Sequence, residues 1–176
     1  YRFGLTGTLD GTQTHQLVLE GLFGAVEKVV TTKQLIDKNT LAKLKIKCVI
    51  LKHQEIREKM TYAEELEYLV TNEKRTDFVV NLLRHLNGNT LCLFQLVEKH
   101  GKILNDKMKG SENVYFVYGG TDTSEREKIR GLVEKHTKST TIASYGTFST
   151  GINIRNIHNI VLASPSKSKI RVLQSI

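Results

Sequence analysis

The sequence predicts an α/β fold in three layers, with a mainly parallel β-sheet between two layers of helices. Short β-rich runs alternate with longer amphipathic stretches, and this spacing of strand, helix and strand indicates a parallel sheet with crossover connections. The runs from residue 90 onward are almost continuously apolar, as strands are when helices cover both faces. A chain of 176 residues is long enough to form one domain with a proper core.

Strands are predicted at short runs that are rich in β-forming residues. The single proline, Pro165, follows the last of these runs, where a strand needs no further backbone N–H. The predicted strands are Val26–Val30, Ile46–Leu51, Thr90–Phe94, Val114–Val117, Thr140–Ser144 and Asn159–Leu162.

Helices are predicted between several of these strands. Thr61 to Glu64 and Ser124 to Glu127 both have the pattern of a capping box, which satisfies backbone N–H groups at a helix start. Apolar residues recur at helical spacing after the second box. Phe78–Leu86 and Leu96–Met108 also suit helices, and the many charges of residues 53–77 indicate a solvated helical face.

The composition is that of a globular protein with a basic surface. Apolar residues make up 39% and charged residues 25%, and the formal net charge is +8 with a pI near 9.5. A basic surface attracts polyanions, so nucleic acid is the first partner to consider, although a lysine-rich surface also serves solubility alone. No apolar run approaches the roughly 18–20 residues that span a bilayer, and the N-terminus has no signal pattern. We expect a cytoplasmic protein without a membrane partner.

The two cysteines and six histidines predict no metal site. Cys48 and Cys92 each lie inside an apolar run, and we expect both to be buried free thiols in core strands, which fits a reducing compartment. Neither cysteine has metal-ligand spacing, and the histidines are scattered along the chain, so surface or capping roles are expected for them.

A glycine-containing loop follows the predicted strand Thr140–Ser144 and offers a ligand site. Ligands of open parallel sheets bind beyond the carboxyl ends of the strands. Gly151 allows a phosphate or sugar to approach the backbone closely, and the hydroxyls of Ser144 and Thr147 can donate to phosphate oxygens. By pattern alone, a loop of serine, threonine and glycine that binds nothing remains open.

Three segments in this order resemble helicase motifs. Leu5-Thr6-Gly7-Thr8-Leu9 resembles motif III, residues 142–154 resemble motif V, and Gln174-Ser175-Ile176 resembles the first residues of motif VI. Asn89–Phe94 resembles motif IV. The chain thereby resembles the second half of a superfamily two DNA helicase, and most closely the UvsW-type phage recombination helicases. The resemblance covers nearly the whole chain and is strongest at residues 1–24 and 88–176.

The resemblance implies roles for individual residues. Gly151 and Asn153 would face the nucleotide, and the segment with Ser144, Tyr145 and Thr147 would face the DNA backbone. Many family members have a carboxylate in place of Asn153, but an amide can still hydrogen-bond a ribose hydroxyl. Further nucleic-acid contacts are expected from Gln95 and Arg126, and the residues expected to couple ATP hydrolysis to DNA movement are Thr6, Gly7, Thr8 and Gln174.

The resemblance also implies a domain organisation. Residues 1–14 would be the end of a first RecA-like domain with a linker, and residues 15–176 a second RecA-like domain of a P-loop helicase, truncated within motif VI. The parent would be an ATP-dependent DNA helicase acting on branched recombination and replication intermediates, in the host cytoplasm if phage-encoded. Its partners would be branched or single-stranded DNA and the missing N-terminal RecA-like domain.

The catalytic groups of such an enzyme are incomplete in this sequence. It has no G-x-x-x-x-G-K-[ST] loop, no Asp-Glu pair at a strand end, and ends before the arginines of motif VI. The intact parent would use ATP and Mg²⁺, while this chain alone would bind neither tightly and would be inactive. Two alternatives stay open: a non-catalytic nucleic-acid-binding module, and a different α/β enzyme, against which the absence of a G-x-G-x-x-G fingerprint counts.

Overall fold

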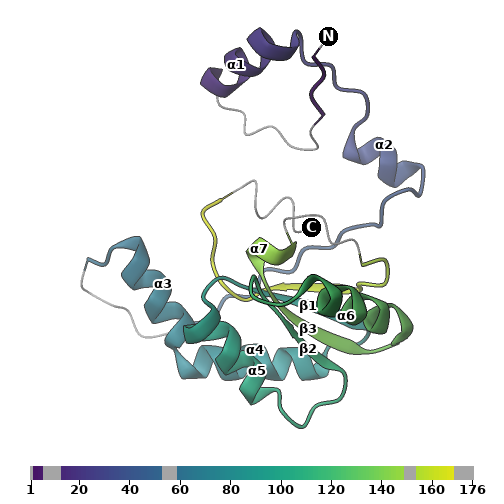
Figure 1. Ribbon diagram of the computed structural model, residues 1–176. Coiled ribbons are helices and arrows are strands. Elements are labelled where there is room, and N and C mark those ends of the chain that lie inside the picture. Colours follow the sequence, from purple (N-terminus) through teal and green to yellow (C-terminus); the bar gives the residue numbers. More distant parts are fainter. Residues whose placement is uncertain (1, 6–12, 53–58, 149–153, 169–176) are drawn as a thin grey trace. The chain divides into compact units, whose positions relative to one another are not determined.

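The computed structural model describes residues 2–5, 13–52, 59–148 and 154–168 (Figure 1). The chain divides into two compact units, residues 1–55 and residues 56–176. Within the described part, no helix is both long and apolar enough to cross a membrane.

A parallel sheet forms the centre of the second unit. Its strands are β1 (Asn89–Phe94), β2 (Val114–Val117), β3 (Ser139–Ser144) and β4 (Asn159–Leu162). They lie in the order β2-β3-β1-β4, and every neighbouring pair is parallel. The α/β class, the parallel sheet and four of the six predicted strands are confirmed.

Two apolar layers cover the sheet, because alternate side chains of β1 point to opposite faces. Cys92 and Phe94 pack in one buried cluster with residues of α4 (Glu73–His85) and α5 (Lys102–Lys107). Leu91 and Leu93 pack in the other, against which Ile129 of α6 (Thr123–Lys135) lies. Figure 1 shows α4 and α5 on one side of the sheet and α6 on the other. The predicted three-layer arrangement is thus present, and it explains why β1 is buried along its whole length.

The helices of this unit follow the predicted pattern, with differences at their starts. Thr61 and Glu64 form the expected capping box: the Thr61 N–H donates to the Glu64 carboxylate over 2.7 Å, and the Thr61 hydroxyl accepts from the Glu64 N–H. The second box was wrong. Ser124 lies inside its helix, which begins at Thr123, and no side chain caps it. The helices are α3 (Tyr62–Thr71), α4 (Glu73–His85), α5 (Lys102–Lys107), α6 (Thr123–Lys135) and α7 (Tyr145–Phe148).

The predicted helix Leu96–Met108 contains a widened turn. Its first part is a π-helix, η1 (Val97–Gly101), in which the Gly101 N–H donates to the Leu96 carbonyl five residues earlier over 2.9 Å. The ring of Phe94 lies where a side chain at position 101 would be. Glycine at this position therefore lets the turn pack directly onto the core.

A buried asparagine ties the amino ends of the strands together. The side-chain amide of Asn89 donates to the carbonyls of Val133 and His136 at the end of α6, over 3.0 and 2.8 Å. Its side-chain oxygen accepts from the Ser139 hydroxyl over 2.8 Å. Asn89 thus fixes the start of β1 to the start of β3 and to the last turn of α6.

The first unit contains two helices, α1 (Gln13–Phe23) and α2 (Thr32–Asp37), and no strand among its described residues. The strands predicted at Val26–Val30 and Ile46–Leu51 were therefore wrong. Both segments lack a neighbouring strand, and their apolar side chains are largely exposed. The same holds for Cys48, which is exposed rather than buried, whereas Cys92 is buried as expected. The predicted boundary at residue 14 stays a prediction.

Substituting Gly101 by alanine is expected to lower the free energy of unfolding by about 1–3 kcal/mol, through overpacking. An added methyl carbon would come within 2.5 Å of the Phe94 ring, which is fully buried. Gly131→Ala in α6 is the matched control: its added carbon meets nothing within 4 Å, so a gain of about 0.5–1 kcal/mol is expected. Chemical denaturation measures both. Equal stability of Gly101→Ala and the wild type would contradict this packing.

Candidate functional site

The carboxyl ends of β1 and β3 form a switch point of the sheet. The helix after β1 packs on one face, where Leu104 joins the cluster of Cys92 and Phe94. The connection after β3 reaches the other face, where Ile157 packs with Leu93. Since these two strands are neighbours and their connections leave to opposite faces, the edge between them is where open α/β sheets bind ligands.

Four polar groups from four different segments converge on residues 163 and 164, directly after β4. The Arg75 guanidinium of α4 donates to the Ala163 carbonyl over 2.5 Å, and the Tyr145 hydroxyl donates to the Ser164 carbonyl over 2.8 Å. The Ser164 hydroxyl accepts from the Gln95 N–H over 3.1 Å and lies 2.9 Å from His100 Nδ1. We call this set the Ser164 cluster: Arg75, Gln95, His100, Tyr145 and Ser164.

The electrostatics of the Ser164 cluster keep its histidine neutral. Burial lowers the pKa of His100 to about 4, and the positive charge of Arg75 acts in the same direction. Burial also lowers the pKa of Arg75. Among the described buried atoms without a hydrogen-bond partner are Arg75 Nη1, Gln95 Oε1 and His100 Nε2. The cluster thus holds strong hydrogen-bonding groups at the carboxyl edge, beyond those it uses on Ser164.

Comparison with known proteins finds a similarity that runs along the whole chain. The whole chain aligns with the ATP-dependent DNA helicase UvsW of enterobacteria phage T4, at 36% identity over 184 aligned positions. The chain is thus similar to a UvsW helicase along its whole length. It spans about a third of that protein's length, 36%. No family model matches the chain, and no solved structure matches it. With the parallel sheet, the relationship identifies the second unit as an α/β domain of the RecA-like class.

The segment that resembles motif V of the UvsW-type helicases begins at the end of β3. Ser144 and Thr147 lie side by side there, with their hydroxyl oxygens 2.7 Å apart. Tyr145 starts the short helix α7, and its side chain is only 2% exposed. A direct contact between the Tyr145 hydroxyl and a nucleic acid would therefore require its bond to Ser164 to break. The DNA role of these three residues stays a prediction.

The other two residues predicted to touch nucleic acid lie at the same edge. Gln95 directly follows β1, and its side-chain oxygen is buried. Arg126 of α6 donates to the carbonyls of Thr121 over 2.8 Å and Gly119 over 2.9 Å. Arg126 therefore holds the loop after β2 together instead of extending into solvent, which places a positive charge on that loop.

The remaining residues implied by the helicase resemblance lie outside the described residues. They are Thr6, Gly7 and Thr8 of the motif III segment, Gly151 and Asn153 of the motif V segment, and Gln174 of the motif VI segment. Their roles stay predictions.

Sequence reasoning missed the partners of Tyr145 and Gln95. Arg75, His100 and Ser164 are far apart in the sequence and come together only in the fold. His100 was expected at the surface or at a helix end, yet it is completely buried. Its position directly behind an apolar strand, inside an amphipathic pattern, is the only signal that could have indicated burial. Among the described residues, no group of His, Cys, Asp or Glu is arranged to hold a metal ion.

The neutral state of His100 predicts a loss of stability in mild acid. In the unfolded chain the histidine pKa is near 6.5, and in the folded protein it is about 4. Between these values the unfolded state binds more protons, so the free energy of unfolding falls as the pH drops from 6.5 toward 4. A decrease of about 2–3 kcal/mol is expected over this range. Chemical denaturation at a series of pH values measures it.

His100→Asn is the control for this pH dependence, because an amide oxygen can replace Nδ1 beside Ser164 but does not titrate. The difference in stability between wild type and His100→Asn should shrink as the pH falls through this window. A difference that stays constant from neutral pH to pH 4 would mean that His100 is not held neutral by the fold.

Proposed function

We propose that the chain is part of an ATP-dependent DNA helicase or translocase, in which it supplies one wall of the ATP cleft and part of the DNA track. The observation that carries the proposal is the 36% identity along the whole chain to a protein named as an ATP-dependent DNA helicase. The polar groups at the carboxyl edge of a parallel sheet support it, since this edge is where such folds bind ligands.

The proposed DNA track runs along the start of α7 and the loop after β2. The Ser144 hydroxyl is a neutral donor, which suits phosphate oxygens at any sequence of bases. Thr147 is buried and bonded to Ser144, so its proposed part is to hold that hydroxyl in place. Arg126 adds a positive charge on the neighbouring loop, and the net charge of +8 favours a polyanionic partner. These contacts carry no sequence information, as a translocating enzyme requires.

The proposed nucleotide contacts come from Gly151 and Asn153. ATP and Mg²⁺ would bind in the complete enzyme between this domain and a preceding RecA-like domain, whose boundary with this one we place near residue 14. The Asn153 amide can hydrogen-bond a ribose hydroxyl, and glycine at position 151 lets a phosphate approach the backbone. This sequence contains no phosphate-binding loop, so the chain alone is expected to hydrolyse no ATP.

The bond from Tyr145 to Ser164 joins the first residue of α7, on the proposed DNA side, to the chain directly after β4. We propose that this bond couples the DNA side to the motif VI segment further along the chain. The substrates proposed for the complete enzyme are branched recombination and replication intermediates, within the host cytoplasm.

The chain is expected to bind single-stranded DNA weakly and without sequence preference. Affinity should fall steeply with salt, because lysine and arginine contacts to phosphates release counterions. Fluorescence anisotropy with labelled oligonucleotides of different sequence, at two salt concentrations, measures this. Tight binding that ignores salt, or a strong preference for one sequence, would contradict the proposed track.

In the complete enzyme, Gly151→Val should abolish DNA-stimulated ATP hydrolysis, because a branched side chain would fill the space that the nucleotide or backbone needs. Asn153→Ala should be milder, about three- to tenfold, since one hydrogen bond typically contributes about 0.5–1.5 kcal/mol. Phosphate release and melting temperature are measured for each. A Gly151→Val enzyme that melts normally and turns over at the parent rate would refute the motif V assignment and favour a non-catalytic DNA-binding module.

A further inference from the structure

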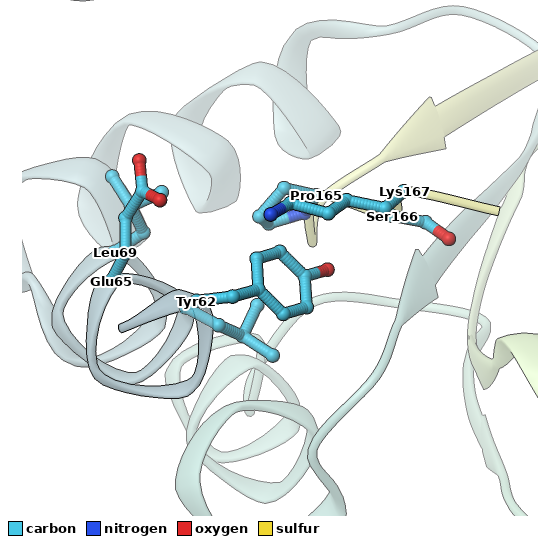
Figure 2. Close-up of a pocket in the computed structure, with 7 residues that line it drawn as sticks. Tyr62, Glu65, Leu69, Pro165, Ser166 and Lys167 are labelled. Carbon is cyan, nitrogen blue, oxygen red and sulfur yellow. The ribbon is translucent and has the colours of Figure 1, made fainter. Parts of the chain in front are cut away.

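A small cavity lies between α3 and the chain that leaves β4. Its volume is about 190 Å³, and its floor is apolar, formed by Leu66, Leu69 and Pro165. Figure 2 shows the Tyr62 ring beside Pro165, with Lys167 nearby. Glu65 and Ser166 complete the lining. The cavity begins one residue after Ser164, and so belongs to the same carboxyl edge as the candidate functional site.

An aromatic ring and a cation meet at the mouth of this cavity. The Lys167 ammonium lies 4.2 Å from the centre of the Tyr62 ring. Lys167 is exposed and Tyr62 is half-buried, so both can reach a ligand. The capping box at Thr61 and Glu64 fixes the backbone of the helix start, from which the Tyr62 side chain extends. An aromatic ring beside a basic side chain is the combination with which proteins bind single-stranded nucleic acid.

The size of the cavity limits what can enter it. Sites for whole cofactors or drug-sized ligands typically occupy about 300–1,000 Å³, and this cavity is smaller, at about 190 Å³. A single planar base suits the space, and its sugar and phosphate would remain outside, where Lys167 lies. Glu65, Ser166 and Lys167 lie in the lining beside an apolar surface formed by Leu66, Leu69, Pro165 and the Tyr62 ring. We expect stacking and apolar contact, which are the same for every base, to hold the base.

We propose that this cavity takes one unpaired base of the DNA strand, which displaces the Lys167 ammonium from the face of the Tyr62 ring and stacks there, while Lys167 turns to the adjacent phosphate. The inference rests on the proposed DNA function and adds a base-stacking site to a track otherwise made of backbone contacts. Because every base has an aromatic face, the site distinguishes unpaired from paired DNA without selecting a sequence.

The test uses the absence of tryptophan from this sequence. Tyr62→Trp introduces the only indole of the chain, and its fluorescence should be quenched by a short oligothymidylate but not by an abasic oligomer of equal length. Tyr68→Trp, on the same helix but outside the cavity lining, is the matched control and should respond equally to both.

Binding measurements with substitutions complete the test. Tyr62→Ala should weaken binding of the oligothymidylate about tenfold and leave abasic binding unchanged, whereas Lys167→Gln should weaken both and lower the salt dependence by about one ion. Circular dichroism confirms that each variant is folded.

The outcomes separate the two proposals. If the wild type binds both oligomers equally and Tyr62→Ala changes neither affinity, the stacking site is refuted while the DNA track stands. If the wild type binds neither oligomer, both proposals fail. If the fluorescence of the Tyr62→Trp indole does not change when either oligomer binds, the cavity does not take a base. It is then left for an apolar side chain of a protein partner.

Discussion

The carboxyl edge of the sheet depends on one constraint, the convergence of four segments on residues 163 and 164. Hydrogen bonds from Arg75, Gln95 and Tyr145, with His100 alongside, fix the direction in which the chain leaves β4. These groups lie in or beside the low-dielectric interior, where satisfied polar networks select one arrangement and misplaced ones are costly. The cavity beside Tyr62 and the position of α7 both follow from where this exit points.

The polar side chains at the two ends of β1 differ in how fully they are hydrogen-bonded. At its amino end, Asn89 uses its side-chain oxygen and both amide hydrogens on neighbouring segments, which closes that edge. At its carboxyl end, Gln95 keeps a buried side-chain oxygen without a protein partner. The sheet is thus anchored at one edge and retains hydrogen-bonding capacity at the other.

The sequence pattern predicted the elements of the second unit well and their long-range partners poorly. Strand β1 is continuously apolar from Leu91 to Phe94 and can be recognised from this short run, because strands buried on both faces are rich in apolar residues. The runs Val26–Val30 and Ile46–Leu51 are also short and rich in β-forming residues, but they have no neighbouring strand. Composition alone therefore misassigned them. The hydrogen bond between Tyr145 and Ser164 spans 19 positions and depends on which strands are adjacent, which no local pattern encodes. The resemblance to helicase motifs indicated the carboxyl edge of the sheet as the site, but only the fold showed that the Tyr145 side chain points inward.

The widened turn η1 makes this architecture sensitive to chain length. A π-turn contains one residue more than the α-helical turn it replaces, and such turns commonly mark functional sites. Removing one residue from Val97–Gly101 would restore an ordinary helix but rotate what remains of the turn by about 100° relative to α5. His100 would then no longer face Ser164, and Gly101 would no longer pack against the Phe94 ring. Homologous chains can therefore exchange side chains freely along the outer face of this turn, while insertions and deletions within it are expected to be excluded.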